Sequence, residues 1–286
     1  MIHMKKLILL FLLIFFSSFV SVGYAEEDYK ELYFFFNRHD SMSEASSYRD
    51  GPNEIKTPKD FLLITKLILP EVTIPDTIGQ LRNLKKLQFS QFFEKELPAS
   101  LEKLQSLEEL EICNSKFTHL PDPIKQLKNL QTLVITNHHL IELPSWINEL
   151  SNLHKLLIPC GDLKTLPREI GELNNLSNLD VSNNNLVTLP DSIVSLKGLK
   201  ELQLQKNKLT HLPRDFEQLS KLQVLTLHGN EGLNVPSNWF QFENFEVLTL
   251  PEHQSYDLRI SKDFIKVSYE ENILGKWIRE WRDITP

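Results

Sequence analysis

Apolar residues recur along this chain at a fixed period of 23 residues. Each period opens on an aliphatic residue followed by proline, at Ile74, Leu97, Leu120, Leu143, Leu166, Leu189, Leu212 and Val235. In the most regular period, residues 166–188, apolar residues stand at positions 1, 5, 8, 11, 14, 16 and 21. The shared period and pattern predict an array of eight structural repeats over residues 74–257, numbered 1 to 8 below.

Each repeat is predicted to form one coil with a short strand and a return segment. Positions 14 and 16 are apolar on either side of position 15, and this period of two indicates a strand. Positions 5, 8 and 11 have the spacing of a helical or 3₁₀ segment, which would return the chain on the opposite side. Because every strand runs in the same direction, stacked repeats would pair their strands into a parallel sheet.

The pattern LPxxIxxLxxLxxLxLxxNxL, clearest in residues 166–188, resembles the 23-residue class of the leucine-rich repeat family that many bacterial proteins carry. The resemblance covers residues 74 to about 250. It implies an α/β solenoid, namely a curved leucine-rich repeat horseshoe with a parallel β-sheet on the concave face. Short helical or 3₁₀ returns would form the convex face, with caps at both ends. The resemblance also implies binding of another protein through the concave face.

The first 25 residues have the pattern of a signal peptide. Lys5 and Lys6 precede the apolar run LILLFLLIFF, and Gly23-Tyr24-Ala25 places small residues where a signal peptidase cleaves. A retained membrane anchor is the alternative, but the unbroken apolar run of ten residues is shorter than the roughly 20 that a spanning helix needs. We therefore expect an exported protein with no stable membrane insertion after cleavage, located in the periplasm, on the cell surface or outside the cell.

Both ends of the array are predicted to carry caps, because the terminal coils would otherwise expose their cores. Residues 26–73 would form an N-terminal cap with a degenerate first repeat, FLLITKLIL, at 61–69. Residues 258–286 would form a C-terminal helical cap, since an apolar stripe repeats at helical spacing in ENILGKWIREW.

The negative net charge of the chain disfavours some classes of binding partner. The chain has a formal net charge of −7, and removal of residues 1–25, which hold two lysines and no acidic residue, makes it −9. Nucleic acids and anionic membranes need a basic protein surface, so both are disfavoured as partners. Proteins, glycans and small molecules remain compatible with this charge.

Position 19 of each repeat should be asparagine, because its side-chain amide can bond backbone groups in the turn after the strand. Asn184, Asn207 and Asn230 follow this rule. The four preceding repeats depart from it and must satisfy their turns by other means, since they carry Phe92, Ser115, His138 and Gly161.

Positions 13, 15 and 17 are predicted to face the concave side, free of core packing and available to a partner. The candidate partner-binding residues are Lys86, Gln88, Glu109, Glu111, Thr132, Val134, Lys155, Leu157, Pro159, Asn178, Asp180, Glu201, Gln203 and Thr226. Among them, Val134, Leu157 and Pro159 would form a central apolar patch with acidic residues on both sides. An apolar centre with a polar rim is typical of a binding hot spot, although isolated exposed apolar residues are also common on inert surfaces.

Catalytic and metal-binding motifs are missing from the sequence. We find no phosphate-binding glycine loop, no HExxH pair and no serine elbow, so we expect no enzymatic activity and no cofactor. A metal site at His138, His139 and Cys160 is conceivable, but His138 occupies the inward position 19 and is expected to satisfy its turn instead. Cys113 and Cys160 lie two repeats apart, about 10 Å at 4.8 Å per strand, too far for a disulfide.

These observations favour an exported, non-enzymatic protein that mediates protein-protein interaction through its concave face, with surface or host-directed adhesion as one form. A structural or envelope-associated protein that binds glycan or cell-wall components is the alternative. The identity of the partner cannot be derived from these residues.

Overall fold

The computed structural model describes residues 58–71, 74–92, 94–235 and 246–251. The predicted signal peptide, the predicted C-terminal helical cap and most of the predicted N-terminal cap lie outside these residues. The chain divides into two compact parts at Ile135 and Thr136, which we describe separately. Within the described ranges, no helix is long and apolar enough to cross a membrane.

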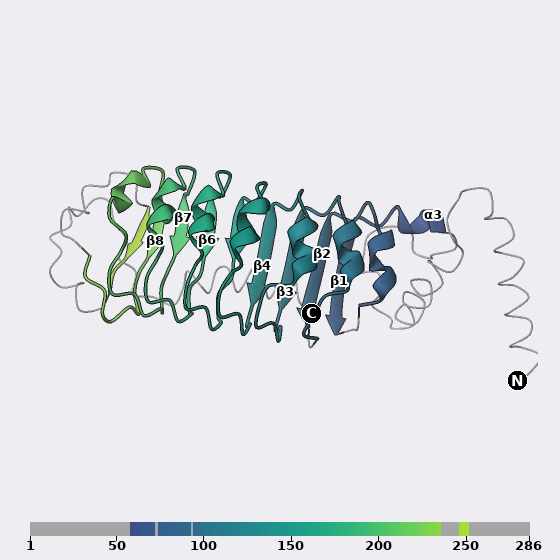
Figure 1. The fold of residues 1–286 in the computed structure, drawn as a ribbon, viewed down its shortest axis with the longest axis horizontal. Coiled ribbons are helices and arrows are strands. Elements are labelled where there is room, and N and C mark those ends of the chain that lie inside the picture. The colour runs from purple at the N-terminus through teal and green to yellow at the C-terminus, as the bar shows by residue number, and fades with distance from the viewer. Residues whose placement is uncertain (1–57, 72–73, 93, 236–245, 252–286) are drawn as a thin grey trace, which may run out of the picture. The chain divides into compact units, whose positions relative to one another are not determined.

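The N-terminal part alternates strands with 3₁₀ helices (Figure 1). After the short helix α3 (Pro58–Phe61), its elements are β1 (Lys66–Glu71), η2 (Asp76–Gln80), β2 (Lys86–Gln91), η3 (Ala99–Lys103), β3 (Glu109–Cys113), η4 (Asp122–Gln126) and β4 (Thr132–Thr136). The strands β1, β2 and β3 pair in parallel, and position 13 pairs with position 13, as in Lys86 with Glu109. β1 joins β2 in the same register, since Leu67 pairs with Leu87.

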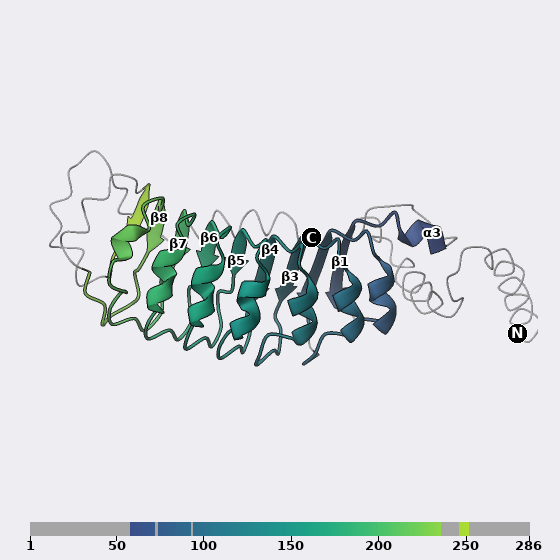
Figure 2. The same cartoon turned by 45° about the horizontal axis from the view of Figure 1, so that its top comes forward.

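The C-terminal part repeats this order with shorter strands. Its elements are η5 (Ser145–Glu149), β5 (Lys155–Leu157), η6 (Arg168–Glu172), β6 (Asn178–Asp180), η7 (Asp191–Ser195), β7 (Glu201–Gln203), η8 (Phe216–Gln218), β8 (Val224–Thr226) and β9 (Val247–Thr249). All five strands pair in parallel with their sequence neighbours. Figure 2 shows the 3₁₀ helices on one side of these strands. This is the predicted α/β solenoid of strands and 3₁₀ returns.

An aliphatic residue followed by proline marks the start of the 3₁₀ helices η2 to η7, each of which follows the proline directly, whereas η8 follows Asp215. Pro167 is extended, with φ −69° and ψ 152°, and its carbonyl accepts a bond from the N–H of Ile170 at 3.1 Å. Proline has no N–H to leave unpaired before the helix, and its fixed φ suits the extended start. Ile170, Leu173 and Leu176 are 0% exposed, so the return segment packs its apolar positions into the core behind the strand.

The predicted asparagine ladder is confirmed in repeats 5 to 7. Asn184 Oδ1 accepts from Leu163 N–H of the preceding repeat at 3.0 Å, and its Nδ2 donates to the carbonyl of Ile158 at 2.8 Å. Asn207 and Asn230 make the equivalent bonds one and two repeats later. Each amide thus joins two turns whose backbone groups have no strand partner.

The N-terminal part satisfies its turns with longer strands and aromatic rings. β1 and β2 have six residues each, against three in β5 to β9, and a further bridge links Phe92 to Ser115. Phe92 packs between Phe89 and Phe117, with ring centroids 5.3 Å apart in both pairs. Backbone pairing between strands therefore replaces the hydrogen bonds that a ladder asparagine would make. The phenylalanine rings fill the space that its side chain would occupy.

Position 18 turns the chain through the left-handed backbone region in every repeat from 2 to 7. Asn114, Asn137, Asn183 and Gly229 are suited to this conformation, but Cys160 also adopts it, with φ 62°. Its thiol is half-buried and accepts a bond from Asn183 Nδ2 at 3.2 Å. Cys160 is therefore a turn residue under backbone strain.

Replacing Cys160 with asparagine should raise the free energy of unfolding by about 1 kcal/mol, because asparagine tolerates the left-handed region better than cysteine does. Cys160→Ser is the matched control, since serine loses the thiol without gaining this tolerance. Urea unfolding at pH 7 measures both variants. Equal stability of the asparagine and serine variants would contradict the assignment of strain to Cys160.

Candidate functional site

One side of the strands lies away from the 3₁₀ helices, and we call this side the strand face (Figure 2). Positions 13, 15 and 17, which carry the predicted binding residues, alternate along each strand with the buried core positions 14 and 16 and therefore lie on the strand face. In the C-terminal part, the register places Leu157 beside Asp180, and Asp180 beside Gln203. At position 13 on the same face, Lys155 pairs with Asn178, and Asn178 with Glu201. Lys155 is exposed, and the half-buried members are Leu157, Pro159, Asn178, Asp180, Glu201 and Gln203.

Several candidate residues are much less accessible than the sequence predicted. Gln88, Glu111, Val134 and Thr226 are 3%, 7%, 3% and 5% exposed. Parallel strands lie about 4.8 Å apart, so side chains at position 15 of neighbouring repeats cover one another. The prediction that these positions are free of packing is therefore wrong for these four residues. Of the three residues of the predicted apolar patch, Val134 is buried, and Leu157 and Pro159 remain half-buried.

The N-terminal strand face carries an ion cluster around Lys86. Its ammonium group lies 2.9 Å from Glu111 Oε1 and 3.2 Å from Glu109 Oε2. Burial raises the pKa of Glu111, and Lys86 opposes this rise. Burial alone would lower the pKa of Lys86, but the two carboxylates outweigh it and raise that pKa. Lys86 thus compensates part of the negative charge of Glu109 and Glu111. Thr132, on β4, is half-buried.

A polar network covers the strand face at β7 to β9. Thr226 donates to Gln205 Oε1, and Gln205 Nε2 lies 3.5 Å from Gln203 Oε1. His228 Nδ1 and Thr249 Oγ1 are 3.0 Å apart. The sequence prediction omitted Gln205, His228 and Thr249 from the candidate site, although they occupy positions 15 and 17. Their shared register was the available signal.

Asp180 lies between this network and the apolar pair. Its Oδ1 accepts a bond from Ser182 N–H at 2.8 Å. Burial raises the pKa of Asp180, and the hydrogen bonds from Ser182 oppose the rise. In the part of the chain that the structure describes, no lysine, arginine or histidine forms an ion pair with Asp180 or Glu201.

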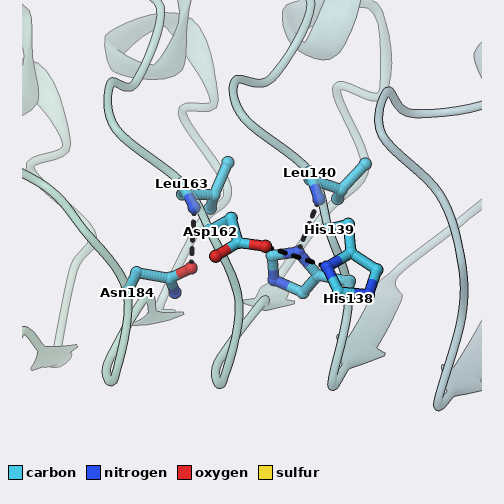
Figure 3. Close-up of polar contacts among 6 residues, drawn as sticks. All are labelled: His138, His139, Leu140, Asp162, Leu163 and Asn184. Atoms are coloured by element: carbon cyan, nitrogen blue, oxygen red, sulfur yellow. Dashed lines mark hydrogen bonds and ion pairs between the residues drawn. The ribbon is translucent and has the colours of Figure 1, made fainter.

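His138, the residue that suggested a metal site, satisfies its turn as predicted (Figure 3). Leu140 N–H donates to His138 Nδ1 at 3.0 Å, so Nε2 carries the ring proton and faces the carbonyl of Ile158 at 3.4 Å. Burial lowers the pKa of His138 to about 4, against the opposing effects of Ile158 and Asp162. The ring is therefore neutral at pH 7, and neither nitrogen has a free lone pair for a metal ion.

Gly161, one repeat later at position 19, packs directly against this ring. A Cβ on Gly161 would lie 2.0 Å from His138 Cε1 and 2.4 Å from Nδ1, which no real contact allows. The ring of repeat 3 thus fills the space where a side chain of repeat 4 would lie. His138 and Gly161 together take the place of the asparagine ladder in repeats 3 and 4, and the ladder itself begins at Asn184 (Figure 3).

The remaining histidine, cysteine and carboxylate side chains of the described residues show no metal-binding arrangement. Among the residues that the structure describes, no three histidine, cysteine, aspartate or glutamate side chains gather closely enough to hold a metal ion. Cys113 and Cys160 do not form a disulfide, in agreement with their two-repeat separation. His139 Nδ1 lies 2.9 Å from Asp162 Oδ2 in an exposed pair, which is weak because solvent screens it.

Comparison with known proteins identifies similar repeats. A family model described as leucine rich repeat matches residues 174–231. The solved structure of a leucine-rich repeat protein from Leptospira interrogans is 33% identical, with a TM-score of 0.57, covering 70% of this chain and 57% of that one. No curated protein sequence matches the chain.

Two further solved structures are similar at lower identity. One is the leucine-rich repeat ectodomain of a plant membrane receptor kinase from Arabidopsis thaliana, in complex with Casparian strip integrity factor 2. It is 26% identical with a TM-score of 0.55, covering 64% of this chain and 23% of that one. A TDR receptor is 27% identical with a TM-score of 0.54, covering 67% and 40%. The chain thus spans less than two thirds of each of these three solved proteins.

Proposed function

Since this chain is a leucine-rich repeat protein, we propose that it is an exported, non-enzymatic bacterial protein that binds another protein through its strand face. Adhesion at a surface is one form that this function takes. The similarity to the plant ectodomain that was solved in complex with Casparian strip integrity factor 2 supports a protein-binding role.

The accessible apolar pair on the C-terminal strand face carries this proposal. Leu157 and Pro159 are half-buried while Leu156 and Ile158, between and beside them, are 0% exposed. The fold therefore uses Leu156 and Ile158 for its core and has no such use for Leu157 and Pro159. Apolar side chains beside polar groups, on a face that no helix of the described residues covers, supply the centre of a binding site.

Leu157→Arg should reduce protein binding about tenfold or more, because it places a charge in the apolar centre. Val187→Arg is the matched control, since Val187 is 47% exposed and lies outside the strands, between β6 and η7. Capture of proteins from an extract, and retention on isolated cell-wall material, measure both variants against the unchanged protein.

The two binding assays separate the proposed function from its alternative. Protein capture that Leu157→Arg does not change would overturn protein binding through this face. If Leu157→Arg abolishes retention on wall material and Val187→Arg does not, this result would favour the envelope-associated function. Fractionation of the producing cell and N-terminal sequencing test export, with a mature chain expected to begin at Glu26.

A further inference from the structure

The apolar pair on the C-terminal strand face adjoins two carboxylates, Asp180 and Glu201, that form no ion pair with any described residue. Asp180 pairs with Leu157 across β5 and β6, and Glu201 lies on β7 beside Asn178. Adjacent strands are about 4.8 Å apart and alternate residues about 7 Å apart along a strand, so Asp180 and Glu201 are diagonal neighbours at about 8 Å. A single ammonium or guanidinium group can lie between them.

The N-terminal part shows what happens when the chain supplies that cation itself. Lys86 at position 13 forms a 2.9 Å ion pair with Glu111, at position 15 of the next repeat. Lys155 and Asp180 have the same relation in register, yet among the described residues they form no ion pair and Lys155 is exposed. The difference has a cause, because Asn178 stands where Glu109 supplies the second carboxylate to Lys86.

Other polar groups on this face leave the two carboxylates available. Gln203, Gln205 and Thr226 bond to one another. Asp180 accepts hydrogen bonds from the neutral backbone N–H and side chain of Ser182. Within the described residues, the arrangement therefore offers an apolar contact and, one strand further, a negative charge that no cation pairs with.

We propose that the strand face of β5 to β7 binds a protein segment with a lysine or arginine beside an apolar side chain. The cation would lie against Asp180 and Glu201, and the apolar side chain against Leu157 and Pro159. This inference rests on the proposed function and adds the chemistry of the partner. Charge complementarity argues for it, since a cation pairs with carboxylates that otherwise lose part of their hydration without compensation.

A random seven-residue peptide library, selected on the complete protein, tests the inference. Selected peptides should be enriched in lysine or arginine next to an apolar residue. The double variant Asp180→Asn/Glu201→Gln should weaken their binding about tenfold, while Lys155→Met, which removes a competing cation, should leave binding equal or tighter. Asp191→Asn/Glu217→Gln is the matched control, because it removes the same charge from exposed residues of η7 and η8.

The outcomes distinguish this inference from the proposed function. Peptide binding that Leu157→Arg abolishes, but that Asp180→Asn/Glu201→Gln does not change, overturns the cationic partner and keeps the binding face. Binding that neither change affects overturns both. Selected peptides without basic residues, or a dimer of the protein itself that Leu157→Arg dissociates, would also overturn the cationic segment as occupant.

Discussion

Gly161→Asn is expected to destabilise the protein by about 3 kcal/mol or more, although asparagine is the residue that the repeat pattern favours at position 19. The new side chain would occupy the space of the buried His138 ring, since even a Cβ would lie 2.0 Å from Cε1. Overpacking of a core costs about 1–3 kcal/mol, and displacing His138 adds the cost of an unpaired Leu140 N–H, about 1–3 kcal/mol. This ranks the substitution among the most damaging single changes.

His138→Asn in the same chain should restore most of this loss. The asparagine introduced in place of Gly161 could then accept from Leu140 N–H, as Asn184 accepts from Leu163 N–H at 3.0 Å. His138→Asn alone should cost about 1–3 kcal/mol, because Leu140 N–H loses its 3.0 Å acceptor while Gly161 offers no replacement. Two harmful changes should therefore combine into a chain within about 1 kcal/mol of the original.

Urea unfolding of the four chains gives the coupling between the two positions. We expect a coupling of about 3 kcal/mol in favour of the double variant. Asn207, which follows the ladder pattern, supplies the control, since Asn207→Gly should be destabilising whether or not His138 is changed. If the losses of stability at His138 and Gly161 are additive, then the asparagine at position 161 does not replace the His138 ring as the acceptor for Leu140 N–H, and the explanation is wrong.

The period of the sequence predicted the strands, the returns and the asparagine ladder because each repeat satisfies its backbone locally. Leu-Pro starts the return, and Asn184 bonds groups within one repeat of itself. The use of the His138 ring and Gly161 in place of two ladder asparagines could not be predicted from the sequence in the same way. The sequence showed two departures from the pattern in consecutive repeats, at His138 and Gly161, but only the structure shows that the ring of one occupies the place of the other.

The candidate site was predictable in register but not in accessibility. Position 15 does lie on the strand face, as the pairing of Leu157 with Asp180 shows. Whether a side chain there is accessible depends on the size and bonding of both neighbours. Glu111 is buried in part because Lys86 forms an ion pair with it and covers it, whereas no described lysine pairs with Asp180. Such side-chain arrangements involve pairs of repeats, and a pattern within one repeat does not contain them.

Acid should destabilise the protein through the buried His138. Its pKa is lowered by burial to about 4, whereas an unfolded histidine has a pKa of about 6.5. Above pH 6.5 the ring is neutral in both states and has no effect. As the pH falls from 6.5 to 4, the unfolded chain binds a proton that the folded chain does not, so the free energy of unfolding falls. The loss is about 1.4 kcal/mol per pH unit, or about 3 kcal/mol at pH 4.

Comparison with His138→Asn/Gly161→Asn isolates this effect from other titrating groups. Burial raises the pKa values of Glu111 and Asp180, so the folded chain binds their protons more tightly and acid acts on them in the opposite direction. Both carboxylates are present in the unchanged chain and in the double variant, and their contribution cancels in the difference. Exposed His119→Asn is the control for a histidine outside the core.

Urea unfolding at pH 7, 5.5 and 4 should show the unchanged chain losing stability relative to the double variant by about 3 kcal/mol in total. The His119→Asn chain should lose it in parallel with the unchanged chain. A constant difference between pH 7 and pH 4 would mean that His138 takes up its proton without unfolding, for example by releasing Leu140 N–H and turning Nδ1 toward Asp162. Protonation of His138 would then not lower the free energy of unfolding in acid. The hydrogen bond from Leu140 N–H to His138 Nδ1, at 3.0 Å, would then contribute little to stability.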